Sequence, residues 1–245
     1  MNAAVTGAVY VDAMNRDPTD RECRRAFVNL ALALAPTGGR LFDFGSGPGI
    51  DAKLYAESGL RVGAYDVDSA MCEYFATYCA AEIASGSVQL NTGSYQDFLR
   101  SSDLSAGDGV DLIVSNFAPL NLVDDLAPLF LKFAAMLGAN GQLLVSVLNP
   151  FFHLMASGSR WMRLPELLLR GHYTTQLHGV IPVTRWLPGR LARFARPFFE
   201  LTAIHVPVSD RPGRPPTRLN PSVLCAPRNA ATQFLFLQFR RNARQ

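Results

Sequence analysis

The sequence contains few of the residues that build disulfide frameworks or metal sites. Its 245 residues include only four cysteines and four histidines, and they form neither a CxxC pair nor a Cys/His metal pattern. Isolated cysteines are typical of reduced proteins in the cytoplasm. No apolar run reaches the roughly 18 residues that a transmembrane helix needs. These absences predict a soluble, cytoplasmic protein that holds no metal and no disulfide framework.

Lysine is nearly absent as well, since Lys53 and Lys132 are the only two. Arginine supplies the remaining positive charge, and it is unevenly distributed. Residues 1–149 contain 9 Lys and Arg against 17 Asp and Glu, whereas residues 150–245 contain 14 against 3. The basic half is either the solvated surface of an arginine-rich chain or a surface that faces an anionic substrate, carrier or membrane.

Apolar runs alternate with helical patterns up to residue 149, which is typical of βαβ units. We expect strands at 40–44, 61–66, 88–91, 110–115 and 142–148, and helices at 20–34 (with Asp20 as N-cap), 50–57, 69–83 and 126–137. Two more strands are expected at 199–206 and 232–239, the last as an antiparallel edge strand because Arg240 and Arg241 end it. Residues 150–198 are expected to be irregular, with short amphipathic pieces. The pattern predicts one α/β domain.

A glycine-rich loop follows the first expected strand, with the sequence Asp43-Phe-Gly-Ser-Gly-Pro-Gly49. Glycine lets a backbone turn sharply and approach a ligand closely, and ligands of open α/β sheets bind at the carboxyl ends of strands. Ile50 stands where the dinucleotide fingerprint GxGxxG needs its third glycine, and no Gly-Lys-Ser/Thr follows as in a P-loop. With these two motifs excluded, the pattern in the sequence is an acid followed by GxGxG.

This loop resembles the first motif of class I S-adenosylmethionine (SAM)-dependent methyltransferases, and the stretch that begins at Ser115 resembles the bacterial small-molecule type of this class. The resemblance implies that Gly45, Ser46 and Gly47 pass under the methionine part of SAM and that Asp43 helps to hold its ammonium group. It also implies a Rossmann-like, seven-stranded, mostly parallel sheet with an antiparallel last strand, helices on both faces and a small cap after the fifth strand. SAM would be the cofactor and S-adenosylhomocysteine (SAH) the product, with no metal.

Three further strand ends extend the resemblance. Asp66 ends the second strand, where a carboxylate can accept hydrogen bonds from both ribose hydroxyls, and the family's D-x-S-x-x-M pattern implies that Val67 and Met71 line the adenine. After the third strand, many members of this family have the pair Gly-Asp. In this sequence Ser94 replaces that acid, so that Ser94, Asp97 or the Tyr95 backbone would reach the adenine base. The fourth strand end resembles an S-N-F-G-A-L-N stretch, which implies cofactor contacts by the residues Asn116, Phe117 and Asn121, and Tyr10 occupies a position that often closes over SAM.

The resemblance also suggests a plan of the domain. Residues 1–36 would form an N-terminal helical lid, 37–149 the SAM-binding core, 150–198 the substrate cap and 199–245 the closing strands. A general base is needed only if the acceptor atom keeps a proton, and the candidates are His153, His172 and Tyr173. Arginines of the cap, among them Arg160 and Arg185, could receive a carboxylate or phosphate.

Several functions stay open at this stage. The first is methyl transfer to an O, N or C atom of a small metabolite that is anionic or held on a carrier. A second is attack on another carbon of SAM, for which the binding motifs would look the same. A nucleic-acid methyltransferase is disfavoured because the fourth strand ends in Ser-Asn-Phe-Ala and not in Asn-Pro-Pro-aromatic. A non-catalytic SAM-binding partner is the last alternative, and the oligomeric state is open.

Overall fold

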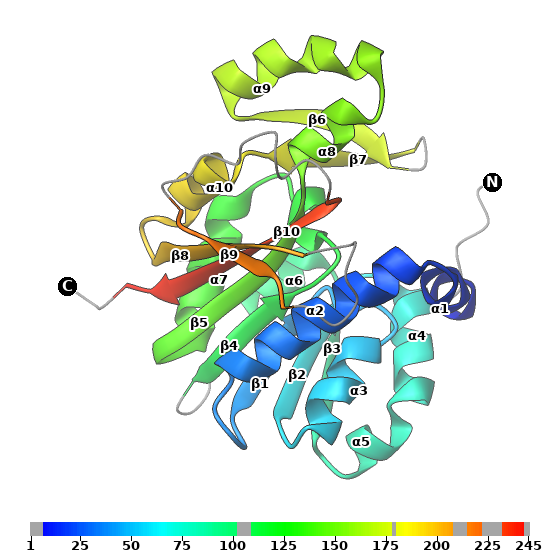
Figure 1. The fold of residues 1–245 in the computed structure, drawn as a ribbon. Coiled ribbons are helices and arrows are strands. Elements are labelled where there is room, and N and C mark those ends of the chain that lie inside the picture. The colour runs from blue at the N-terminus through cyan, green and yellow to red at the C-terminus, as the bar shows by residue number, and fades with distance from the viewer. Residues whose placement is uncertain (1–6, 102–108, 178–179, 208–214, 222–231, 243–245) are drawn as a thin grey trace.

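The computed structural model describes residues 7–101, 109–177, 180–207, 215–221 and 232–242. In these ranges an eight-stranded sheet has the order β3-β2-β1-β4-β5-β10-β8-β9 (Figure 1). Its strands are β1 (Arg40–Phe44), β2 (Arg61–Asp66), β3 (Val88–Thr92), β4 (Val110–Ser115), β5 (Leu137–Leu148), β8 (Phe199–Val206), β9 (Thr217–Leu219) and β10 (Phe234–Arg241). The strands β1 to β5 pair in parallel, and β10 is antiparallel to both of its neighbours. The α/β class is therefore confirmed, with eight strands in place of the seven expected.

The last strand was expected at an edge, and this was wrong. β10 lies between β5 and β8, while the three-residue β9 covers the far side of β8. Four consecutive residues of β10, Phe234 to Leu237, are buried. An apolar run of this kind is typical of a strand that is covered on both faces, whereas Arg240 and Arg241 lie only at its end.

Helices cover both faces of the sheet, as expected. They are α1 (Gly7–Arg16), α2 (Pro18–Leu34), α3 (Ile50–Glu57), α4 (Ser69–Tyr78), α5 (Ala80–Ala84), α6 (Tyr95–Arg100), α7 (Leu126–Met136), α8 (Pro150–Met155), α9 (Leu164–Arg170) and α10 (Pro188–Ala195), with 3₁₀ turns η2 (Pro119–Leu122) and η3 (Gly158–Arg163). Phe27 of α2 packs edge-on against Phe236 of β10 on one face. Phe130 of α7 contacts Phe199 and Phe239 on the other. Two apolar cores thus hold the layers together.

Several element boundaries differ from the expectation. Asp17, and not Asp20, caps α2: its carboxylate accepts from the Thr19 N–H at 2.7 Å, and Pro18 occupies the first turn, where a missing N–H costs nothing. The helix expected at 69–83 divides at Cys79 into α4 and α5. The fifth strand starts at Leu137, with residues 138–141 displaced by a register shift opposite β4.

The segment 150–198, which we call the insertion, is more regular than expected. It contains α8, η3, α9, a hairpin of β6 (His172–Leu177) and β7 (Ile181–Trp186), and then α10. Figure 1 shows α8, α9 and the hairpin gathered at one end of the molecule. The hairpin was missed because Pro182 lies within its second strand, and proline is rare in strands. Nowhere in the described ranges is a helix long and apolar enough to cross a membrane.

Candidate active site

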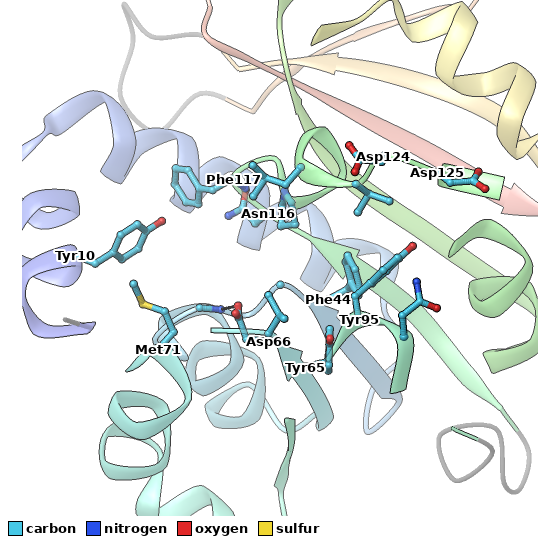
Figure 2. Close-up of a pocket in the computed structure, with 17 residues that line it drawn as sticks. Tyr10, Phe44, Tyr65, Asp66, Met71, Tyr95, Asn116, Phe117, Asp124 and Asp125 are labelled. Carbon is cyan, nitrogen blue, oxygen red and sulfur yellow. Dashed lines mark hydrogen bonds between the residues drawn. The ribbon is translucent and has the colours of Figure 1, made fainter. Parts of the chain in front are cut away.

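A cavity of about 490 Å³ opens at the carboxyl ends of β1, β2 and β4 (Figure 2). Nine of the thirteen predicted cofactor residues line it, namely Tyr10, Gly45, Gly47, Asp66, Val67, Met71, Tyr95, Asn116 and Phe117. They come from α1, the glycine loop, two further strand ends, α4 and the start of α6. Figure 2 shows Tyr10 approaching from one side, with Met71 below it and Phe117 above it. Segments far apart in the sequence therefore meet around one space of the size that small-molecule ligands occupy.

The glycine loop is held against the end of β2. The N–H groups of Gly45 and Ser46 donate to the Tyr65 carbonyl at 2.8 and 3.0 Å. Gly45 has φ +73°, and a Cβ there would lie 2.5 Å from Cγ of Pro119. Only glycine fits this turn and this close approach to η2. The close approach brings the β1 loop and the β4 loop to the same wall of the cavity.

Asp66 faces the cavity with both carboxylate oxygens already bonded to backbone. Its Oδ2 accepts from the Gly47 N–H at 2.7 Å, and its Oδ1 accepts from the Asp68 N–H at 2.9 Å. Burial raises the pKa of this carboxyl, and these backbone hydrogen bonds oppose the increase. Each carboxylate oxygen can accept a second hydrogen bond, so Asp66 retains capacity for a ligand hydroxyl.

Asp43 lies deeper, at 2% exposure, and is absent from the cavity wall. Its Oδ2 has no hydrogen-bond partner. Burial raises the pKa of Asp43 well above its usual value, and the nearby carboxylates of Asp51 and Asp66 add to the effect while Arg24 opposes it. A buried, unsatisfied carboxylate among other acids favours a cationic partner.

A polar network that the sequence did not reveal supports the fourth strand end. Arg24 of α2 forms an ion pair with Asp51 of α3, and Asp51 Oδ2 accepts from Asn116 Nδ2 at 2.9 Å. The Arg24 guanidinium also lies 4.7 Å from the centroid of the Phe117 ring. Phe117 and Ala118 both have positive φ, at 58° and 68°, which is uncommon for residues with a Cβ. The network thus holds the cavity residues Asn116 and Phe117 at the start of a turn that is costly by itself.

Other cavity residues were also missed. Phe44, Tyr65 and Gln96 line one side, and the stretch from η2 to the start of α7 lines another with Pro119, Leu122, Val123, Asp124 and Asp125. The Tyr65 hydroxyl donates to the Gly93 carbonyl at 3.1 Å. Strand-end position was a usable signal for Tyr65, because it directly precedes Asp66.

Ser46, Ser94 and Asn121 complete the predicted cofactor set, and like Asp43 they do not line the cavity. Ser94 caps α6, since its Oγ accepts from the Asp97 N–H at 3.1 Å and donates to the Asp97 carboxylate. Asn121 is buried: its Nδ2 donates to the Thr184 carbonyl at 2.6 Å, and its Oδ1 accepts from the Leu148 N–H. Asn121 thereby ties η2 to the hairpin and to β5.

The three candidate general bases lie in the insertion and do not line the cavity. The Tyr173 hydroxyl donates to the Pro150 carbonyl at 2.8 Å and lies 3.1 Å from His153 Nδ1. Burial lowers the pKa of His153 to about 4, assisted by Arg185, Arg160 and Arg163, whereas burial raises the pKa of Tyr173 to about 12. His172 lies against Trp186, with ring centroids 4.6 Å apart and ring planes tilted by 40°. His153 is therefore neutral, and Tyr173 keeps its proton, at neutral pH.

Comparison with known families identifies the fold and its family. A family model described as a methyltransferase domain matches residues 15–183. The chain belongs to this methyltransferase family. Its enzyme class and the class I SAM-dependent methyltransferase fold expected from the sequence are thereby confirmed. Among curated proteins no sequence matches the chain.

Solved structures of methyltransferases share the fold at low sequence identity. The CcbJ methyltransferase of Streptomyces caelestis has a TM-score of 0.63 at 17% identity, over 95% of this chain and 96% of that one. The 1,6-didemethyltoxoflavin-N1-methyltransferase of Burkholderia thailandensis, solved with 1,6-didemethyltoxoflavin and SAH, scores 0.60 at 17% identity, over 96% and 87%. The N-methyltransferase NodS of Bradyrhizobium japonicum, solved with SAH, scores 0.58 at 14%, over 94% and 90%. The described part of this chain contains no cluster of three or more His, Cys, Asp or Glu side chains that could hold a metal ion.

Proposed function

We propose that the chain binds SAM in the 490 Å³ cavity and transfers its methyl group to a small, anionic metabolite. The observation that carries the proposal is the convergence of nine predicted cofactor residues on one cavity. Solved relatives of the same fold hold SAH and, in one case, a small acceptor, which supports the choice of ligand and substrate size.

The residues of the cavity suit the parts of SAM. Asp66 has unused acceptor capacity for the ribose hydroxyls, and Val67 and Met71 supply an apolar wall for the adenine. The unsatisfied Oδ2 of Asp43 is buried and does not line the cavity, but a carboxylate just before the glycine loop would attract the ammonium group of the methionine part. Phe117 presents an aromatic ring, which favours a nearby cation such as the sulfonium.

SAM supplies an activated methyl carbon, so the transfer needs no covalent enzyme intermediate. The acceptor atom would form a bond to that carbon while the carbon–sulfur bond breaks, and the electron pair would stay on the sulfur of SAH. The protein contributes by aligning the two molecules and excluding water. The network of Arg24, Asp51 and Asn116 serves this alignment, because it holds Phe117 in its positive-φ turn.

If the acceptor atom carries a proton, we propose His153 as the base. Its low pKa leaves the ring neutral and able to accept a proton, but makes it a weak base until a bound anion raises that pKa. Tyr173 would orient the ring through the hydrogen bond to Nδ1. The N-terminal helices α1 and α2 would form the lid, because Tyr10 of α1 lines the cavity.

Calorimetric titration with SAH tests the cofactor half of the proposal. Asp66→Ala should weaken SAH binding by roughly 1–3 kcal/mol, the usual effect of removing a charged hydrogen-bond partner. Asp111→Ala is the matched control, because the Asp111 carboxylate also accepts from a backbone N–H, that of Arg40, but at the opposite end of the sheet. Absence of SAH binding to the folded wild type would reject the cofactor.

Mass spectrometry of spent SAM tests the reaction itself. Methyl transfer leaves SAH, whereas attack on another SAM carbon leaves a different sulfur product such as methylthioadenosine. Candidate acceptors for the assay are small carboxylates and phosphate esters. Salt-dependent binding of DNA or RNA would instead favour a nucleic-acid acceptor.

A further inference from the structure

Arg185 of β7 is a buried cation without a counter-charge. Its side chain is only 8% exposed, its Nε donates to Thr175 Oγ1 at 3.1 Å, and its Nη1 has no hydrogen-bond partner. No carboxylate of the described residues forms an ion pair with it; Glu166, the acid of the insertion, bonds to Arg163 at 3.0 Å and lies 3.7 Å from Arg170. Buried charges in proteins are normally paired and fully hydrogen-bonded. The described residues therefore leave Nη1 of Arg185 without an anionic partner.

The surroundings of Arg185 are positive as well as dry. Arg160 and Arg163 lie near enough, together with Arg185, to disfavour protonation of His153. Tyr173 is directly opposite Arg185 in the hairpin, and its hydroxyl lies against His153. Because the Tyr173 proton is donated to Pro150, the His153 Nδ1 must supply the proton of their mutual hydrogen bond. The described polar groups around Arg185 are thus cationic or neutral.

The hairpin that carries Arg185 is fixed to the wall of the SAM cavity. The carbonyl of Thr184, the preceding residue, accepts from Asn121 Nδ2 at 2.6 Å. Asn121 belongs to η2, whose Pro119 and Leu122 line the cavity. A ligand group held at Arg185 would therefore be anchored to an element that also borders the cofactor.

We propose that Arg185 binds a carboxylate or phosphate group of the acceptor molecule, with Arg160 supplying a second positive charge at the rim. The unused Nη1 donor belongs to a planar guanidinium, whose geometry suits such an oxyanion. This inference rests on the proposed methyl transfer for its role, but anion binding at Arg185 can be measured without SAM and without knowing the acceptor.

The test measures anion binding by calorimetry and by thermal unfolding, using inorganic phosphate and acetate as probes at constant ionic strength set with chloride. We expect wild type to bind one of the probes and to melt at a higher temperature in its presence. Arg185→Leu should weaken that binding by about tenfold or more, since a charged hydrogen bond is lost. Arg193→Gln, which removes an exposed arginine of the neighbouring α10, should bind the probe as wild type does.

The stability of the variants without added anion is a second, independent readout. Replacing an unpaired buried charge by an apolar side chain is often neutral or stabilising, so Arg185→Leu should melt no lower than wild type in chloride alone. If Arg185→Leu does not fold, Arg185→Lys should fold and bind the probe more weakly than wild type, because lysine lacks the planar guanidinium.

The outcomes separate the two proposals. Equal probe binding by wild type and Arg185→Leu, or no binding of either probe to wild type, would overturn the anion site. SAH titrated into the same proteins should bind equally to wild type and Arg185→Leu. Absence of SAH binding to wild type would reject the cofactor proposal and would leave the anion result unaffected. Once an acceptor is found, phosphate esters and carboxylates that differ only in the anionic group identify which oxyanion Arg185 receives.

Discussion

The sheet core and the insertion each contain a poorly exposed arginine, and the two arginines have opposite surroundings. Arg24 packs on the core with its guanidinium bonded to Asp51, and its side chain is 15% exposed. Arg185 in the insertion is also buried but has only the hydroxyl of Thr175 as a partner. The core thus pairs its arginine with a carboxylate of its own, whereas no carboxylate of the described residues pairs with the arginine of the insertion. We therefore propose that the core holds the constant cofactor and that the insertion receives an acceptor with its own charge.

Substituting the two arginines separately gives the largest expected contrast. Arg24→Leu leaves the buried Asp51 without its ion pair, and losing one partner of a buried pair should lower the free energy of unfolding by about 3 kcal/mol. Arg185→Leu should lower it little or not at all. Urea unfolding of both variants measures the difference.

Removing the Asp51 carboxylate, which Arg24→Leu leaves unpaired, provides the control for this contrast. Arg24→Leu combined with Asp51→Asn should recover part of the lost stability, because no unpaired charge remains. Equal destabilisation by Arg24→Leu and Arg185→Leu would contradict the distinction between the paired and the unpaired arginine.

Two glycines with positive φ, one in the core and one in the insertion, give a smaller expected contrast between the two regions. Gly45 of the core has φ +73° and faces Pro119, while Gly171 of the insertion has φ +75° and faces the Arg190 side chain. Alanine at either position should cost about 1–2 kcal/mol of stability through the backbone strain alone. Only Gly45→Ala also displaces the cavity wall, so it should weaken SAH binding by about tenfold or more, and Gly171→Ala should leave SAH binding unchanged. Thermal unfolding and calorimetry on both variants separate the two effects, and loss of SAH binding by Gly171→Ala would couple the regions more tightly than proposed.

The core could be predicted from the sequence because its signals are local. The glycine loop and the strand ends at Asp66 and Asn116 are contiguous stretches, and parallel strands bring such ends to one edge of the sheet. The burial of Asp43 behind the loop could not be predicted in the same way, because it depends on how the loop packs. Arg24 was missed for a related reason: it is one of several arginines on a helix, and only the folded structure brings it to Asp51.

The insertion was harder to predict because its contacts are not local. Its hairpin strands are short, and Pro182 interrupts the second one. Asn121 resembled a cofactor residue by its place in a motif, yet its amide is bonded to Thr184 and Leu148. Position within a motif thus predicted the neighbourhood of Asn121 but could not predict which way its side chain points.

The smallest predicted effect concerns His153, which titrates beside the arginines of the insertion. Burial, Arg185, Arg160 and Arg163 lower its pKa to about 4, and the neighbouring Tyr173 stays neutral. Below the ordinary histidine pKa the unfolded chain therefore binds more protons than the folded one, so stability falls as the pH decreases from about 6.5 to about 4. Because His153 is only half-buried, solvent screening should keep its contribution to the free energy of unfolding at about 1 kcal/mol. His153→Gln should reduce the slope of the unfolding free energy against pH in that window, and an unchanged slope would mean that other groups dominate. Phosphate bound at Arg185 would add negative charge beside the ring and raise the pKa of His153. NMR titration of this histidine with and without phosphate therefore reports directly on whether phosphate binds at Arg185.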